Sequence, residues 1–394
     1  MKLLVAISSL SGGGAERTVA TMSAQWAAAG HRVRVVTIAN AAQDTYELNP
    51  AVERVALDLQ RPGVNAAVTL ANNVRRVLAL RRQLRVFEPD VAIGMMTVTN
   101  VLLALASMGL RTRTLGCERV HPPRVPLSAG RAVVRKWVYG RLTAVAALTE
   151  RSAEWLRVNT RARQIFVVPN AVALPLPQAE PVVAPQTVCS PGRKMILGVG
   201  RLDAQKGFSN LIRAFASLES AHPRWDLVIL GEGALRPELE REVKELGVYG
   251  RVFLPGRVGN LADWYAAASL FALSSEFEGF PNALLEAMAH GVPAVSYDCD
   301  TGPAEIIRND IDGFLVQPGD MAAFAKAMDR LMANPAALAA MGACARAVGQ
   351  RFAMPEVLAK WEQVLKAVAP RCGSLDTSAR EPNERPTNVG LDVT

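Results

Sequence analysis

The chain has 394 residues, of which half are hydrophobic and a fifth are charged, and its formal net charge is +8. This composition is typical of a globular protein and is long enough for two domains with their own cores. The five cysteines have no paired spacing and the four histidines form no cluster, which argues against a zinc site or a disulfide framework and favours the cytoplasm. No apolar run approaches the length of a membrane span, so we expect a protein that is soluble or at most peripheral.

The first part of the chain, residues 1–175, alternates short apolar runs with helical patterns, which is typical of βαβ units around a parallel sheet. A strand at Lys2–Ile7 is followed by a glycine-rich loop, Ser11–Gly14, and by a helix that is expected to end near Gly30. Further strands are expected at 32–38, 91–95, 112–115, 144–148 and 165–168, and further helices at 65–87 and 100–108.

A second alternating set follows a stretch that is rich in Pro and Ala and has no periodicity, so we predict a linker at 176–193 and a second domain at 194–353. Strands are expected at 195–199, 226–229, 252–254, 270–273 and 293–295, and helices at 208–218, 235–246, 261–267, 283–289, 322–332, 335–348 and 355–368. Residues 371–394 are polar and patternless, and we expect them to form a disordered tail.

Two doubly wound domains that face each other would enclose a cleft, because ligands of open α/β sheets bind beyond the carboxyl ends of the strands. The most informative stretch for this cleft is 274–309. There, Glu278 and Glu286 are separated by a loop and the start of a helix. A helix N-terminus has unpaired N–H groups and suits an anion such as phosphate. We therefore expect both glutamates to face one phosphate-containing ligand.

Two glycine-bracketed loops are candidates for the same ligand. The loop at 198–207 carries Arg201 and Lys206 after a strand, and two cations there suit a diphosphate, although a solvated surface pair would look the same. In the loop before the first helix, Gly13 and Gly14 would let backbone N–H groups approach a phosphate. This loop is neither a P-loop nor a GxGxxG fingerprint, since Arg17 occupies the third glycine's place, and a plain tight turn is the alternative.

Weaker signals lie at three other places. The turn at Gly231 could border a nucleobase or be an ordinary turn. The loop at 117–123 offers Glu118, Arg119 and His121 as candidates on the acceptor side, and a structural histidine is the alternative. The sequence Asp298-Cys299-Asp300 has the letters of an Asp-x-Asp metal motif, but we favour a loop or N-cap role, because such spacing is common by chance.

Six segments occur in one order along nearly the whole chain: GGGAER (12–17), PDVAIG (89–94), VVPNAV (167–172), GVGRLDAQKG (198–207), EGFPNALLEAMAHGVPAV (278–295) and GPAEII (302–307). Together they resemble the family 4 retaining glycosyltransferases, especially branches that build bacterial surface polysaccharides and glycans on lipid carriers. The resemblance implies a GT-B fold of class α/β, with two Rossmann-like domains facing a cleft and a C-terminal helix, 354–370, that returns to the first domain.

The resemblance also implies roles for the candidate residues. Glu278 would contact the hydroxyls of the donor sugar, and Glu286 would bind the ribose. Arg201 and Lys206 would hold the diphosphate and stabilise the leaving group. The remaining contacts to the donor would come from Gly13, Gly14, Gly231, Gly279, Phe280, Pro281 and Asn282. Whether Glu118 or His121 acts near the sugar stays open.

The implied reaction is the transfer of a sugar from a nucleotide-sugar, with uridine diphosphate as the expected nucleotide, to a lipid-linked oligosaccharide or polysaccharide. It implies no cofactor and no divalent metal. A sugar-nucleotide epimerase of the same fold is one alternative, and a non-catalytic, membrane-associated binder of glycans or nucleotides is another. The set Arg201, Lys206, Glu278 and Glu286 argues against the binder.

Basic residues gather in the first half, and Arg131–Leu142 interleaves them with apolar side chains. Such a segment could lie on the anionic inner face of the cytoplasmic membrane, or it could be an ordinary helix whose apolar face is buried. A nucleic acid partner is disfavoured, because no recognition motif accompanies the charge.

Overall fold

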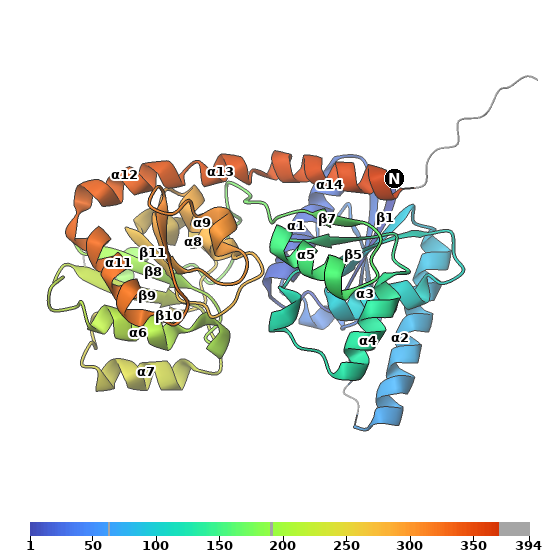
Figure 1. The fold of residues 1–394 in the computed structure, drawn as a ribbon, viewed down its shortest axis with the longest axis horizontal. Coiled ribbons are helices and arrows are strands. Elements are labelled where there is room, and N and C mark those ends of the chain that lie inside the picture. Colours follow the sequence, from blue (N-terminus) through green and yellow to red (C-terminus); the bar gives the residue numbers. More distant parts are fainter. Residues whose placement is uncertain (62–63, 190–191, 370–394) are drawn as a thin grey trace, which may run out of the picture.

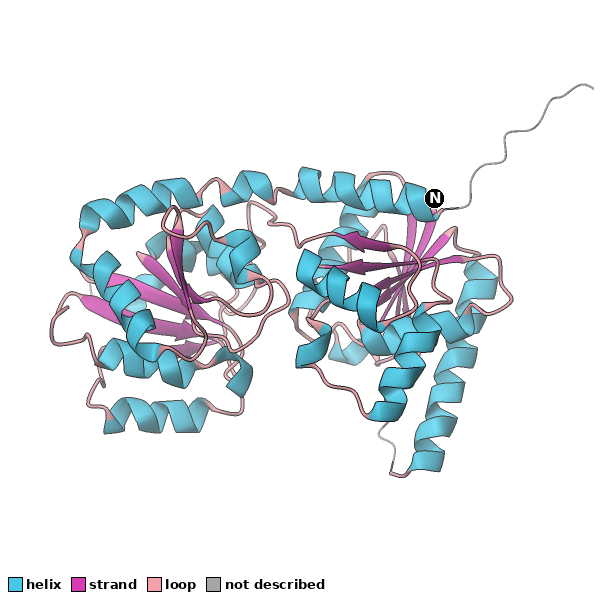
Figure 2. Ribbon diagram, viewed as in Figure 1, coloured by secondary structure: helices cyan, strands magenta, loops and turns pink. Residues whose placement is uncertain are grey.

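The computed structural model describes residues 1–61, 64–189 and 192–369, and the predicted tail lies outside this range. Two parallel sheets, each covered by helices on both faces, stand side by side, and a run of helices crosses above both (Figures 1 and 2). The prediction of two Rossmann-like sheets is confirmed.

The first sheet has the order β3-β2-β1-β4-β5-β6-β7 among the described residues. Its inner strands are apolar runs buried on both faces, as expected when helices cover a parallel sheet on both sides. Its strands are β1 (Lys2–Ile7), β2 (Arg32–Thr37), β3 (Glu53–Ala56), β4 (Val91–Met95), β5 (Arg113–Cys117), β6 (Ala144–Ala147) and β7 (Ile165–Val167). Its helices are α1 (Gly14–Ala28), α2 (Ala66–Phe87), α3 (Thr97–Ala106), α4 (Ala129–Tyr139) and α5 (Glu150–Asn159).

The second sheet has the order β10-β9-β8-β11-β12-β13. Its strands are β8 (Lys194–Val199), β9 (Trp225–Leu230), β10 (Val252–Gly256), β11 (Leu270–Leu273), β12 (Ala294–Tyr297) and β13 (Gly313–Val316). Its helices are α6 (Phe208–Ala216), α7 (Arg236–Glu245), α8 (Leu261–Ala267), α9 (Asn282–Ala289) and α10 (Pro303–Ile306). The strand order reverses between β1 and β4 and between β8 and β11, so a crevice opens beyond the carboxyl ends of these strands. The loops after β1, β8 and β11 are the three that we expected to bind the ligand.

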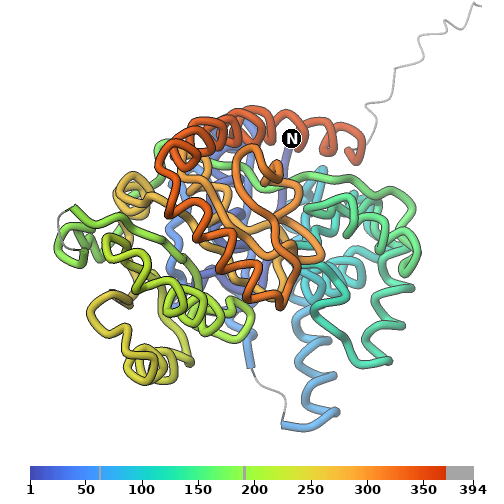
Figure 3. The backbone as a smooth tube through the Cα atoms, turned by 60° about the vertical axis from the view of Figure 1, so that its left-hand side comes forward, coloured from blue at the N-terminus to red at the C-terminus, as the bar shows by residue number. Residues whose placement is uncertain are grey.

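Four helices complete the chain: α11 (Met321–Ala333), α12 (Pro335–Ala345), α13 (Val348–Arg351) and α14 (Met354–Val368). Figure 3 shows this run passing from the second sheet to the first. The side chains of Val357, Trp361 and Leu365 are buried in the core of the first domain, where Trp361 packs edge-on against Trp26 with ring centroids 5.5 Å apart. The predicted return of the last helix to the first domain is thus confirmed.

No single described helix is long and apolar enough to span a bilayer, although α11 and the helices after it pass that test as a pair bent by 102°.

Several short elements were not anticipated from the sequence, among them two strands and a polar helix. The strands β3 and β13 are four residues long, and so short a run carries little periodicity. The helix α5 is mostly polar, and it is held by a Thr149 cap that accepts a hydrogen bond from the backbone N–H of Ser152. The predicted linker also packs on the second domain, since Ala179 and Pro181 exchange backbone hydrogen bonds with Gly259.

Candidate active site

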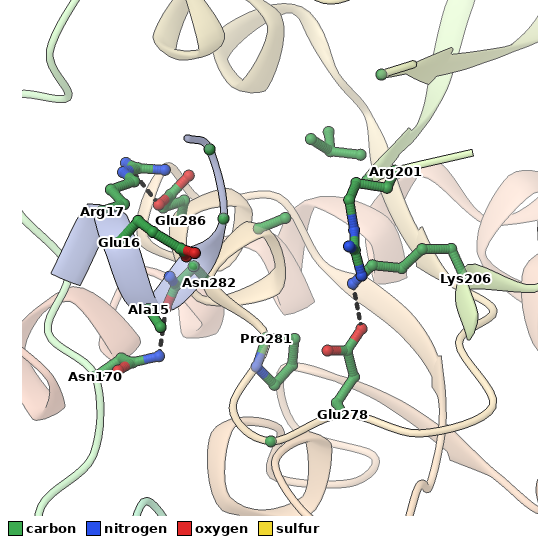
Figure 4. A pocket seen from close by; sticks show the side chains of 18 of the residues that line it. Ala15, Glu16, Arg17, Asn170, Arg201, Lys206, Glu278, Pro281, Asn282 and Glu286 are labelled. Carbon is green, nitrogen blue, oxygen red and sulfur yellow. Dashed lines mark hydrogen bonds and ion pairs between the residues drawn. The ribbon is translucent and has the colours of Figure 1, made fainter. Parts of the chain in front are cut away.

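A cavity of about 620 Å³ lies between the two domains, a size typical of small-molecule sites. The first domain contributes the loop after β1, the start of α1 and Asn170. The second contributes the loops after β8, β9 and β11 and the start of α9 (Figure 4). Segments far apart in the chain therefore converge on one space, as the strand order requires.

At one end of the cavity Lys206 and Glu278 form an ion pair, with Lys206 Nζ 2.6 Å from Glu278 Oε1. The hydroxyl of Ser275 donates a second hydrogen bond of 2.7 Å to the same oxygen. Lys206 ends a short 3₁₀ turn, Ala204–Lys206, and the following Gly207 has φ +59°. A Cβ at Gly207 would overlap with the carbonyl oxygen of Ser274, so glycine is needed to bring this turn against the loop of Glu278.

Arg201 reaches the same end of the cavity from the loop after β8 (Figure 4). Its side chain is 67% exposed and lies 3.1 Å from a carboxylate oxygen of Asp203. A guanidinium so weakly held is free to turn toward a ligand, because exposed ion pairs contribute little free energy. Its contact with a diphosphate stays a prediction.

At the other end of the cavity Glu286 is buried on α9 and receives two hydrogen bonds. Arg17 Nη2 lies 2.8 Å from its Oε1, and the hydroxyl of Tyr265 donates to its Oε2 at 3.1 Å. Burial raises the pKa of Glu286, while the neighbouring Arg17 opposes that shift. Arg17 comes from α1 of the first domain, so this ion pair crosses between the domains. No role for Arg17 was predicted from the sequence, although this residue stands in the GGGAER segment.

Asn170 is a second cavity residue that was not predicted from the sequence, although it lies in the VVPNAV segment after β7. Its Nδ2 donates to Asn282 Oδ1 at 2.7 Å and to the carbonyl oxygen of Phe280 at 3.2 Å. It thereby holds the loop Phe280–Asn282 and the first residue of α9 at the cavity wall. The amino end of α9 is thus turned toward the cavity, where its first N–H groups suit an anion.

Glycines from both domains line the cavity, and one of them, Gly279, allows the domains to approach closely. Gly13 and Gly14 line the cavity from the first domain, and a Cβ on Gly14 would make only an ordinary contact, 3.5 Å from Asn282 Nδ2. At Gly279 a Cβ would overlap with the carbonyl oxygen of Arg119. Gly231, at φ +141°, also lines the cavity where the loops after β8 and β9 meet. These predicted donor contacts all lie at the cavity, and their roles stay predictions.

Glu118 and His121 are not brought to the cavity. Glu118 is buried and accepts hydrogen bonds from Thr97 Oγ1, at 2.9 and 3.0 Å, and from the hydroxyl of Tyr139. Burial raises the pKa of its carboxyl. The imidazole of His121 is buried, and its Nδ1 lies 3.0 Å from the hydroxyl of Ser152. The two residues between them, Arg119 and Val120, do line the cavity.

Asp300 forms ion pairs with Arg124 and, at 3.7 Å, with Arg151, both from the first domain. This is a second electrostatic contact between the domains, and it fits the loop role that we favoured over a metal site. Within the described residues, no three His, Cys, Asp or Glu side chains lie close enough together to hold a metal ion.

The Asp300→Asn variant should be about 0.5–1 kcal/mol less stable than the wild type at pH 7, because the pair is partly exposed. Arg124 lowers the pKa of Asp300 below its ordinary value of 3.8. The stabilisation is therefore present above pH 3.8 and is lost as the pH falls through the lowered pKa. Urea unfolding at pH 7, 5 and 3.5 should show the deficit shrinking only at the lowest pH.

The matched control is Asp310→Asn, which removes a surface ion pair with Arg330 within the second domain. That pair is more exposed, and the control should change stability less. An Asp300→Asn deficit that is the same at all three pH values would contradict the assigned role of the ion pair.

Comparisons with known proteins fit this geometry. Residues 13–171 match the model described as "Glycosyl transferase 4-like domain", and residues 184–348 match "Glycosyl transferases group 1". The chain is 34% identical over 295 residues to the exopolysaccharide phosphotransferase SCO2592 of Streptomyces coelicolor, and this match spans 74% of the chain but only 30% of that protein.

Two further similarities extend along most of the chain. A Campylobacter jejuni alpha-1,4-N-acetyl-D-galactosaminyltransferase, whose name describes a glycan on diphospho-undecaprenol, is 27% identical over 84% of this chain and 89% of its own. The crystal structure of Anabaena HepE in complex with UDP superposes with a TM-score of 0.77 and 21% identity, over 93% of this chain and all of that one.

Proposed function

This chain belongs to the group 1 glycosyl transferases, a family of retaining enzymes with the GT-B fold, and we propose that it transfers a UDP-linked sugar to a lipid-linked oligosaccharide or polysaccharide. The arrangement of Lys206, Glu278 and Glu286 around the amino end of α9 carries the donor half of this proposal. The UDP in the HepE complex and the diphospho-undecaprenol in the name of the Campylobacter relative support the choice of ligands.

In the proposed complex the ribose hydroxyls donate to Glu286 and the diphosphate lies between Lys206, Arg201 and the start of α9. The sugar then extends toward Glu278. The bond between the anomeric carbon and the phosphate oxygen breaks as the acceptor oxygen attacks from the same face. The acceptor proton passes to the leaving phosphate. The ammonium of Lys206 stabilises the charge that develops on this phosphate, which is the main electrostatic contribution expected here.

The experiment that tests the donor is hydrolysis over a panel of UDP-, GDP-, ADP- and dTDP-linked sugars, followed by transfer assays with lipid-linked acceptors. We expect turnover of at least one UDP-sugar. Turnover of GDP- or ADP-sugars alone would reject UDP. Conversion of the donor to an isomeric nucleotide-sugar without any acceptor would support the epimerase alternative, which the family assignment disfavours.

For the membrane we propose that the first domain binds an anionic bilayer through α4. This helix carries half-exposed Val133, Val134 and Trp137 beside the exposed basic residues Arg131 and Lys136. Figures 1 and 3 show α4 and α2 projecting from the same end of the first domain. A basic amphipathic surface of this kind binds lipid through apolar contact and charge together.

Cosedimentation with phosphatidylglycerol vesicles at low salt should show wild-type binding that weakens at high salt. The double variant Arg131→Glu/Lys136→Glu should bind at least about 10-fold more weakly, since each basic residue contributes about 1 kcal/mol. The control Arg241→Glu/Lys244→Glu makes the same charge change on α7 of the second domain and should bind as the wild type does. An absence of wild-type binding at low salt would reject the membrane proposal.

A further inference from the structure

Five basic residues line the described cavity, and Arg119 is the one that is buried, whereas Arg257 also has no ion pair among the described residues but is exposed. Arg17 and Lys206 each pair with a glutamate, and Arg201 lies beside Asp203. Arg119 is only 8% exposed, and it forms no ion pair with any carboxylate that the structure describes. Its Nη2 donates instead to two neutral acceptors, Asn170 Oδ1 and, at 3.3 Å, Thr18 Oγ1.

A buried guanidinium without a counter-charge is unfavourable in the free protein, because its burial removes hydration that no anion replaces. Burial also lowers the pKa of Arg119 to about 10, and no neighbouring carboxylate raises it. The side chain is nonetheless held in place by Asn170 and Thr18 rather than turned to solvent. Such an arrangement is expected where a ligand supplies the missing negative charge.

The position of Arg119 restricts where this charge can lie. Its backbone packs against Gly279, the residue after Glu278, and its guanidinium shares Asn170 with Asn282 at the start of α9. Arg119 therefore lies between the proposed sugar end and the proposed phosphate end of the donor site. It belongs to the first domain, whereas Lys206 belongs to the second.

We infer that Arg119 binds an oxyanion of the donor, which is either an oxygen of the diphosphate or a carboxylate on the transferred sugar. This inference rests on the proposed function, since it takes the cavity to be a nucleotide-sugar site. A guanidinium matches both phosphate and carboxylate through two parallel N–H groups, so the chemistry of recognition is shared.

The test measures the binding of four compounds by calorimetry: uridine, UDP, UDP-glucose and UDP-glucuronic acid. If the diphosphate is the partner, Arg119→Gln should reduce the preference for UDP over uridine roughly 10- to 100-fold, the range for a hydrogen bond to a charged group. If the sugar carboxylate is the partner, Arg119→Gln should keep the preference for UDP over uridine. It should instead lose the preference for UDP-glucuronic acid over UDP-glucose that the wild type then shows. Arg119→Lys should restore part of either effect.

The melting temperature without ligand separates recognition from a structural role. Removal of an uncompensated buried charge should leave it unchanged or raise it, whereas loss of a structural anchor should lower it. The control Arg135→Gln removes a buried arginine that stacks on Trp155 away from the cavity, and it should leave all four affinities unchanged.

Two results for Arg119→Gln would overturn the inference alone: four affinities equal to those of the wild type, or an equal loss for all compounds with a lower melting temperature. Failure of the wild-type chain to bind any of the UDP compounds would instead reject the proposed donor, and this inference with it.

Discussion

The Lys206→Ala variant is expected to transfer sugar about 10²- to 10³-fold more slowly than the wild type, the loss typical when a preorganised electrostatic group is removed from an active site. The ammonium of Lys206 is held 2.6 Å from Glu278 Oε1 and is only 17% exposed, so no reorganisation is needed to present its charge to the leaving phosphate. The effect should appear in kcat at saturating donor. Affinity for uridine, which lacks phosphate, should be unchanged.

The same substitution leaves the Glu278 carboxylate without its cation. Breaking a fully buried pair costs about 3–5 kcal/mol, and the loss here should be smaller, because the pair borders a cavity. The variant Lys206→Met/Glu278→Gln removes both charges and should recover stability without recovering activity. Lys206→Arg keeps the charge, and Lys244→Ala on exposed α7 is the neutral control. Transfer at the wild-type rate by Lys206→Ala would refute the assignment of the leaving-group site.

The Glu286→Gln variant is expected to lower kcat/KM for the donor roughly 10- to 10³-fold, since each hydrogen bond to a charged group contributes about 1.5–3 kcal/mol. Here the loss should lie in binding, because the proposed contact is with the ribose rather than with the reacting bonds. The affinity of Glu286→Gln for uridine should also fall, whereas the affinity of Lys206→Ala for uridine should be unchanged. The substitution also removes the negative partner of Arg17 across the domain interface.

The pH dependence of donor binding gives an independent check on Glu286. Burial raises the pKa of this carboxyl above its ordinary value of 4.5. Wild-type affinity should therefore begin to fall on acidification while the pH is still above 4.5, as the carboxylate takes up a proton. Glu286→Gln is already neutral and should lack this fall. Glu240→Gln, on the exposed face of α7, should behave as the wild type does. An identical pH profile in the wild type and Glu286→Gln would contradict the ribose contact.

Much of this site followed from local patterns in the chain. Lys206 and Glu278 were predicted to lie together because each follows a strand, and parallel strands bring such ends to the same edge. Glu286 joins them from the first turns of the helix that follows Glu278. The alternation of apolar runs and helical patterns was likewise sufficient to predict the two parallel sheets.

The partners of these residues could not be found that way. Arg17 meets Glu286, and Asn170 meets Asn282, across a domain interface and over more than a hundred residues of chain. Glu118 and His121 flank Arg119 and Val120 in the sequence. The side chains of Glu118 and His121 turn to Tyr139 and Ser152, whereas Arg119 lines the cavity. A loop has no fixed period, so its sequence does not say which side chain faces inward.

The six motif segments were thus enough to indicate the family. The two parallel sheets and the loops that border the cleft could be predicted from sequence pattern, since periodicity and glycine placement are local properties of the chain. Which charges in the cleft are paired could be seen only in the folded structure. Two glutamates have cations and Arg119 has no carboxylate partner among the described residues. The reason is physical: burial and ion pairing depend on how closely the two domains approach, as they do where Gly279 meets the carbonyl oxygen of Arg119.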